Sequence, residues 1–164
     1  MSTTASPKKF QFLPFLISLL ITLAIGFGAS LFTRPQISGW YSTLNKPSFN
    51  PPDWLFAPVW TTLYVMIAIA AYLVWKRRDN SRAYSVTVII YTIQLALNFS
   101  WSIMFFGLHG TFPALIIILL LWISIILNIR WFHKFNHTAA WLLAPYLLWV
   151  SFAGLLNLSI YLLN

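Results

Sequence analysis

Three segments of the chain carry aromatic and amide side chains at the spacing of one helix face. In one of them, successive intervals of four, three and four positions place the members on the same side of a helix: Gln94, Asn98, Trp101 and Phe105. Two further segments repeat the pattern, the first with Trp60, Tyr64, Ala68, Ala71 and Trp75, the second with Tyr146, Trp149, Ala153 and Asn157. A cavity lined with aromatic rings and a few amides suits a flat, apolar, polycyclic ligand.

The chain lacks the residues that perform hydrolysis or hold a metal. It has no Cys and only two acidic residues, Asp53 and Asp79, which excludes hydrolytic triads, paired carboxylates and thiolate sites. The three His residues, His109, His133 and His137, fall in or beside predicted loops, whereas a haem held in a helical bundle needs axial His within helices. We therefore predict no metal site and no required cofactor.

The composition excludes a water-soluble protein. Of the 164 residues, 60% are hydrophobic and 7% are charged, whereas soluble domains carry about 25% charged residues. The net charge is +8, but the basic residues lie in short gaps between apolar runs and form no continuous face for nucleic acid. We expect the lipid bilayer to surround most of the chain and no nucleic-acid partner.

Five apolar runs reach the roughly 20 residues that a helix needs to cross a bilayer. They cover about 12–32, 54–75, 83–106, 112–131 and 139–162, and none has an acidic or basic residue in its middle. The alternating segments of a membrane β-barrel are not present. The sequence predicts an all-α fold with a single domain over 1–164, an integral membrane bundle of five transmembrane helices. The fourth run has no aromatic stripe and is expected to face lipid more fully.

The basic residues predict the orientation of the bundle, because Lys and Arg concentrate in cytoplasmic loops. One side holds eight of the ten: Lys8, Lys9, Lys76, Arg77, Arg78, Arg82, Arg130 and Lys134. The other side holds Arg34 and Lys46. In a plasma or inner membrane, the N-terminus is therefore predicted to be cytoplasmic.

The first loop, 33–53, is predicted to be a lid over a cavity, because a structureless loop of that length is uncommon and often functional. Its aromatic, basic and proline residues include Trp40, Tyr41, Lys46, Pro47, Pro51 and Pro52. Anchoring of Trp40 and Tyr41 at the lipid headgroups is the alternative.

The polar and small residues within the runs also have structural interpretations. The amides of Gln94, Asn98 and Asn157 would serve equally as interhelical hydrogen bonds that hold the bundle together. The small-residue pairs Ala24/Gly28 and Gly26/Ser30 would allow close backbone approach within the bundle or across a dimer. By contrast, a place in an interfacial belt explains Trp residues near helix ends but not the deeper ones, Trp60, Trp101 and Trp149.

Three motifs resemble those of the tryptophan-rich sensory protein family (TspO/MBR), whose eukaryotic members are the mitochondrial translocator proteins. They are Trp40–Tyr64, which begins WYSTLNKPSFNPP, then Gln94–Trp101 with Phe105, and Pro145–Ala153 with Asn157. The resemblance implies a five-helix bundle that often dimerises and a pocket closed by the first loop. It also implies that Trp60 and Trp149 line this pocket and that porphyrins, sterols or benzodiazepine-site ligands bind there.

Two departures from the family pattern concern ligand choice. The basic residue that follows the fifth-helix tyrosine in animal members is absent after Tyr161, so the proposed cholesterol motif is incomplete. Phe112 aligns with a pocket tryptophan at the start of the animal fourth helix, which is expected to weaken binding of synthetic ligands.

We expect a membrane receptor or carrier that binds protoporphyrin IX or a related ligand, in tetrapyrrole sensing or transport, and assembles as a homodimer. The expected ligand-binding residues are Trp60, Tyr64, Gln94, Asn98, Trp101, Trp149, Ala153 and Asn157. Lys46 either pairs with porphyrin propionates or is a solvated loop charge. The alternative functions are a light- and oxygen-dependent porphyrin-degrading enzyme, with Trp60 and Trp149 as candidate catalytic residues, and an adaptor that acts through oligomerisation.

Overall fold

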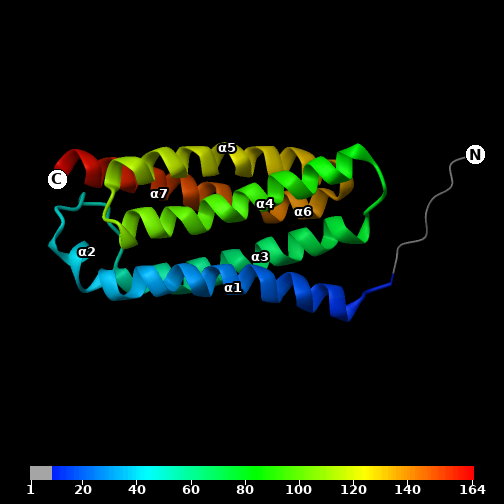
Figure 1. Ribbon diagram of the computed structural model, residues 1–164, viewed down its shortest axis with the longest axis horizontal. Helices are drawn as coiled ribbons and strands as arrows, with labels where there is room; N and C mark the ends of the chain where they lie inside the picture. Colours follow the sequence, from blue (N-terminus) through cyan, green and yellow to red (C-terminus); the bar gives the residue numbers. More distant parts are fainter. Residues whose placement is uncertain (1–8) are drawn as a thin grey trace, which may run out of the picture.

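The computed structural model describes residues 9–164, and over that range the regular elements are all helices. Lys8, one of the residues used to predict the orientation, lies outside the described residues. Five helical segments are long and apolar enough to span a membrane: Phe12–Ile37, Asp53–Lys76, Arg82–Gly107, Thr111–Phe135 and His137–Leu163. They run along the long axis of the molecule (Figure 1). The predicted five-helix membrane bundle is confirmed.

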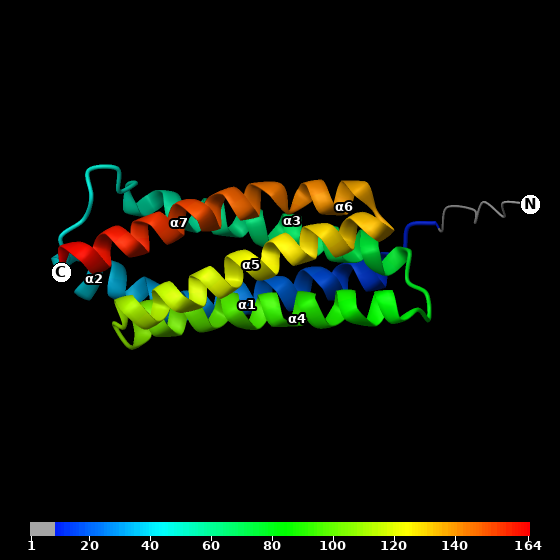
Figure 2. The same ribbon diagram turned by 90° about the horizontal axis from the view of Figure 1, so that it is seen from above.

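The packing order of the helices corrects the expectation for the fourth apolar run. α1 (Phe12–Ile37) packs mainly on α3 (Phe56–Lys76), while α5 (Thr111–Phe135) packs on both α4 (Arg82–Ser102) and α7 (Ala144–Leu163). Figure 2 shows α5 running diagonally between α7 and α4. α5 therefore has neighbours on two sides. The helix that buries the smallest share of its residues is α1, because it packs at the edge of the bundle.

The segment predicted as one long lid loop is partly helical. α1 continues to Ile37 through Pro35, α2 spans Trp40–Thr43, and the 3-10 turn η1 spans Asp53–Leu55. Within 33–53, only 38–39 and 44–52 lie outside helices. The prediction ended the first helix too early because the apolar run ends at about residue 32, whereas the helix continues through Arg34 and Pro35. Proline at this position removes a single hydrogen bond in the last turns.

The fifth membrane-spanning segment is interrupted, a feature that the sequence pattern did not reveal. α6 (His137–Leu142) and α7 are separate helices, with Leu143 between them and Pro145 in the first turn of α7. Pro145 has no N–H to continue the hydrogen-bond ladder of α6. Asn136 caps α6 by accepting a hydrogen bond from the Ala139 N–H at 3.0 Å. The fifth predicted helix thus divides near its start.

α4 ends in a π-helical turn, η2 (Ile103–Gly107). The Leu108 N–H donates to the Ile103 carbonyl at 2.9 Å, five residues back, and this wider turn accommodates one extra residue. In an α-helix, neighbouring side chains point about 100° apart, so one of two adjacent rings often faces outward. In this turn Phe105 and Phe106 are both buried. The turn brings two adjacent rings to the same end of the bundle.

Hydrogen bonds among buried side chains join four of the membrane-spanning helices. The Tyr64 hydroxyl of α3 donates to Asn98 Oδ1 of α4 at 2.6 Å. The Tyr146 hydroxyl of α7 accepts from Asn98 Nδ2 and from Gln94 Nε2, each at 3.0 Å. Asn128 Nδ2 of α5 continues the chain to Gln94 Oε1 at 3.4 Å. We refer to these five residues as the polar chain.

Two glycines of α1 let neighbouring aromatic rings approach its backbone. A Cβ at Gly26 would overlap the ring of Tyr64, and a Cβ at Gly28 would lie 3.1 Å from the ring of Phe99. Of the two roles predicted for the small residues of this helix, packing within the bundle accounts for both glycines. Homodimerisation stays a prediction.

Replacing Tyr146 by Phe is expected to destabilise the bundle by about 1–3 kcal/mol, because two buried amide donors lose their shared acceptor. The free energy of unfolding in mixed micelles, measured by titration with a denaturing detergent, checks this. Tyr161→Phe is the matched control, since Tyr161 is 41% exposed and makes no side-chain hydrogen bond within 9–164. Equal stabilities of the two variants would contradict a structural role for the polar chain.

Gly26→Ala is expected to lower the free energy of unfolding by about 1–3 kcal/mol, because the added methyl group must displace the Tyr64 ring. Gly154→Ala is the control in another membrane-spanning helix, where the new Cβ would meet only an Ile118 methyl group at 3.9 Å. This control is expected to be neutral or up to about 1 kcal/mol more stable, since Ala favours the helix. Similar melting temperatures for the two variants would show that Gly26 is not a packing site.

Candidate functional site

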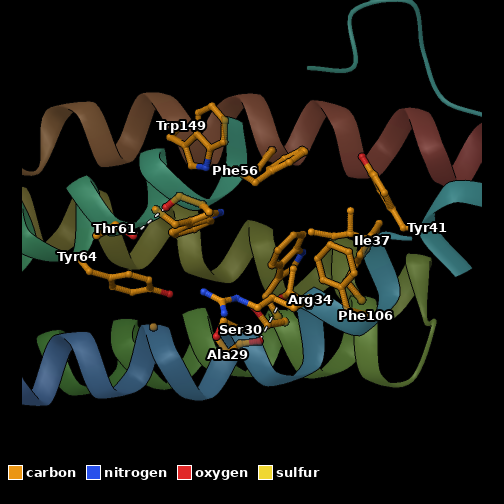
Figure 3. A pocket seen from close by; sticks show the side chains of 18 of the residues that line it. Ala29, Ser30, Arg34, Ile37, Tyr41, Phe56, Thr61, Tyr64, Phe106 and Trp149 are labelled. Atoms are coloured by element: carbon orange, nitrogen blue, oxygen red, sulfur yellow. Dashed lines mark hydrogen bonds between the residues drawn. The ribbon is translucent and has the colours of Figure 1, made fainter. Parts of the chain in front are cut away.

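A cavity of about 370 Å³ lies at the end of the bundle that carries α2. Its walls come from the C-terminal half of α1, the N-terminal part of α3, the end of α4 with η2, and α7. Figure 3 shows side chains from these elements converging on one space. The volume falls within the range of about 300–1,000 Å³ typical of small-molecule sites.

Three tryptophans from three helices line this cavity: Trp60, Trp101 and Trp149. The Trp60 ring stacks on Tyr64, with centroids 5.6 Å apart. The Trp101 ring stacks on Phe105 at 5.3 Å. The Trp149 ring lies 5.6 Å from the ring of Phe152. Each indole is thus supported by a neighbouring ring, while part of its surface faces the cavity.

The indole N–H groups of two of these tryptophans differ in their partners. Trp101 Nε1 donates to Asn157 Oδ1 at 3.1 Å, and Asn157 Nδ2 donates in turn to the Thr111 carbonyl at 2.8 Å. Trp149 Nε1 is buried without a hydrogen-bond partner in the described part of the chain. In Figure 3 this nitrogen points from α7 toward the other cavity side chains. Because a buried donor without a partner is costly, Trp149 offers a donor to a ligand.

The structure brings six of the eight sequence-predicted ligand-binding residues to the cavity: Trp60, Tyr64, Trp101, Trp149, Ala153 and Asn157. The other two, Gln94 and Asn98, do not line it. Both belong to the polar chain and hydrogen-bond to buried tyrosines. The helical spacing correctly placed them on the face of Trp101, but it did not show that α7 covers that face at their depth.

The first connection between membrane-spanning helices closes one end of the cavity through Tyr41. This side chain is 2% exposed, lines the cavity and donates a hydrogen bond from its hydroxyl to Asn50 Oδ1 at 2.7 Å. Burial, with a contribution from the Asp53 carboxylate, raises the pKa of Tyr41 to about 12. The hydroxyl therefore keeps its proton at neutral pH and remains the donor in this bond.

The other residues predicted for the lid do not line the cavity. Trp40 lies behind Tyr41 and stacks on His109, with centroids 4.3 Å apart, and His109 Nε2 is 3.1 Å from Gln36 Oε1. Lys46 Nζ lies 4.7 Å from the centre of the Tyr41 ring. These contacts explain how α2 is held in place at the end of the bundle.

The prolines of this segment, Pro47, Pro51 and Pro52, connect α2 to η1 without reaching the cavity. The segment is attached to the end of α7 by paired hydrogen bonds. The Asn45 N–H donates to Asn164 Oδ1 at 2.9 Å, and Asn164 Nδ2 donates to the Asn45 carbonyl at 3.0 Å. Figure 1 shows the C-terminal end of α7 beside α2.

Sequence reasoning missed the wall that α1 contributes. This wall includes Gly26, Ser30, Arg34 and Ile37, whose spacing of about four residues follows one helix face. Arg34 was interpreted only as an orientation signal, because the predicted helix ended with the apolar run, before Arg34. Phe112, expected at the pocket from the family resemblance, lies outside the lining, where it packs on Tyr161 with ring centroids 5.3 Å apart.

Comparisons with known proteins agree with the sequence motifs. The model of the TspO/MBR family matches residues 18–163. The tryptophan-rich protein TspO of Chlorobaculum tepidum is 44% identical over 158 residues, covering 94% of this chain and 98% of that protein. The protein of the same name from Archaeoglobus fulgidus is 46% identical over 149 residues, covering 90% and 94%. The human translocator protein is 36% identical over 153 residues, covering 90% of each chain. The chain therefore belongs to the TspO/MBR family.

Proposed function

We propose that this multi-pass membrane protein is a receptor or carrier that binds a tetrapyrrole such as protoporphyrin IX in the cavity. The observation that carries the proposal is the convergence of three indoles, from Trp60, Trp101 and Trp149, on one space between helices. Indole faces bind planar aromatic molecules through dispersion and offset stacking. A receptor role also fits the names of the relatives, which include a tryptophan-rich sensory protein from Cereibacter sphaeroides.

The hydrogen-bonding groups of the cavity support a planar ligand held in one orientation. The Trp149 N–H has no partner in the described part of the chain, so an acceptor atom on the ligand edge would satisfy it. Asn157 is already paired on both sides, to Trp101 and to the Thr111 carbonyl. We expect Asn157 to fix the Trp101 ring, while Trp149 contacts the ligand through both its face and its N–H.

The opening of the cavity suggests how an apolar molecule enters. Three lining residues at the facing edges of α1 and α3 are also exposed on the outside of the bundle: Phe27, Ala57 and Thr61. The cavity therefore opens sideways between these two helices. In a bilayer this opening would face lipid, which is where a tetrapyrrole or another apolar ligand accumulates.

The ends of the bundle support the predicted orientation. The described basic residues of the predicted cytoplasmic side lie toward the end opposite the cavity, whereas Arg34 and Lys46 lie at the cavity end. In a plasma or inner membrane, the positive-inside rule then places the cavity in the outer half of the bilayer.

Single-cysteine labelling tests this orientation, because the natural chain has no Cys. Asn80→Cys lies between α3 and α4, and Ser48→Cys lies between α2 and η1. In intact spheroplasts, a membrane-impermeant maleimide is expected to label Ser48→Cys at once and Asn80→Cys only after lysis. The reverse pattern would contradict the proposed orientation.

Replacing two of the three cavity tryptophans, Trp60→Phe with Trp149→Phe, is expected to weaken protoporphyrin IX binding about tenfold or more. Two stacking contacts between the porphyrin and an indole ring, of about 1 kcal/mol each, would be reduced, and the Trp149 N–H donor would be lost. The midpoint of the porphyrin Soret-band titration, in phosphatidylcholine nanodiscs, measures this without depending on the number of tryptophans left.

The matched control is Trp54→Phe with Trp141→Phe, since these tryptophans are 71% and 75% exposed and lie outside the cavity lining. Their removal is expected to leave the midpoint unchanged. Equal midpoints for the cavity pair and the control pair would place porphyrin binding elsewhere and refute the proposed site.

A further inference from the structure

Arg34 is the one charged side chain among the described residues that line the cavity. It lies in the last turn of α1, one helical turn beyond Ser30. In Figure 3 its guanidinium group extends back along α1, over Ser30 and toward Tyr64, and lies among the cavity side chains. A basic residue near a membrane interface usually extends toward water at the end of its helix. Arg34 is an exposed residue, but its guanidinium group extends along the cavity wall and not away from the bundle.

This guanidinium group has no protein partner in the described part of the chain. Within 9–164 it makes no ion pair and no side-chain hydrogen bond. The only acidic residues of the whole chain are Asp53 and Asp79, and neither lines the cavity. The cavity wall therefore carries a positive charge that is accessible and has no counter-ion among the described residues, so a ligand anion is free to pair with it.

The neighbouring hydroxyl groups on α1 cannot substitute for a ligand anion. Ser30 donates its proton to the Phe27 carbonyl at 2.7 Å, and Thr33 donates to the Ala29 carbonyl at 3.1 Å. On the opposite wall, Trp149 Nε1 is a second donor without a partner in the described residues. The unmet groups named here are thus donors, and one of them is a cation. A ligand that completes this site supplies acceptors and negative charge.

We propose that Arg34 binds a carboxylate of the ligand, so that the cavity selects amphipathic acids with a planar apolar body. This inference rests on the proposed function and adds the chemical class of its ligand. The planar guanidinium group matches a carboxylate with two parallel hydrogen bonds. The carboxylate would lie along the α1 wall, and the apolar body would lie against the indoles of Trp60 and Trp101.

The geometry assigns this role to Arg34 in place of Lys46, the residue considered from the sequence. Lys46 lies outside the cavity lining, with its ammonium group over the Tyr41 ring, 4.7 Å from the ring centre. Both residues lie at the same end of the bundle. Lys46 is therefore a matched control for any general effect of positive charge on an anionic ligand.

The test compares protoporphyrin IX with its dimethyl ester, which has the same macrocycle but no carboxylate. Titrations use the full chain in neutral phosphatidylcholine nanodiscs at pH 7.5, with empty nanodiscs subtracted. The wild-type protein is expected to bind the acid about tenfold more tightly than the ester, after correction for partition into lipid. Arg34→Gln is expected to remove this preference by weakening acid binding about tenfold while leaving ester binding unchanged. Lys46→Gln is expected to bind both ligands as the wild-type protein does.

The outcomes separate this inference from the proposed function. Equal acid binding by the wild-type protein and Arg34→Gln overturns the carboxylate site, and so does an equal loss for both porphyrins. In either case the macrocycle still binds and the receptor proposal stands. If neither porphyrin binds the wild-type protein, the proposed function fails first and the inference fails with it. Melting temperatures within about 2 °C of the wild-type value are required of both variants. Arg34→Met, which also removes the charge, replaces Arg34→Gln if that variant is unstable.

Discussion

The requirement that polar groups find partners inside a bilayer determines how this bundle is built. Lipid offers no hydrogen bonds, so each buried hydroxyl or amide has to bond within the protein. Tyr64, Asn98, Tyr146 and Gln94 meet this requirement together, through bonds of 2.6–3.0 Å that connect α3, α4 and α7. These bonds fix how far apart the three helices lie at mid-depth. α1 must then pack around the resulting arrangement, which is why Gly26 lies where the Tyr64 ring comes closest to its backbone.

The cavity begins where the polar chain ends. Tyr64 belongs to both, since its hydroxyl bonds to Asn98 while its side chain lines the cavity. Beyond this point α3, α4 and α7 face one another with the rings of Trp60, Trp101 and Trp149, which are rigid and hold the walls apart. The π-turn η2 adds Phe105 behind Trp101, where the two rings stack at 5.3 Å. The same helices are therefore closely joined at one depth and separated at another.

The sequence predicted the architecture and the helix faces of the three cavity tryptophans, because both depend on periodicity within single helices. Long apolar runs identify membrane-spanning helices, and spacing identifies the face that Trp60 or Trp149 occupies. Spacing does not identify the opposite wall. The amides of Gln94 and Asn98 were expected at the ligand, but Tyr146 from another helix uses their donors. Arg34 was missed for a related reason: it follows the end of the apolar run and was assigned to the first loop, whereas the helix continues through it.

Separation of the amides from the cavity changes which groups are able to orient a ligand. Gln94 and Asn98 are committed to tyrosines, and Asn157 is committed to Trp101 and the Thr111 carbonyl. The stacked indoles supply attraction with little directional preference, since a planar molecule is free to slide across a ring face. Direction must then come from Trp149 Nε1 and the Arg34 guanidinium group, which lie on opposite walls and have no partners within the described residues. Because both are donors, a ligand is aligned by the positions of its acceptor atoms, and an apolar molecule without acceptors would bind in several orientations.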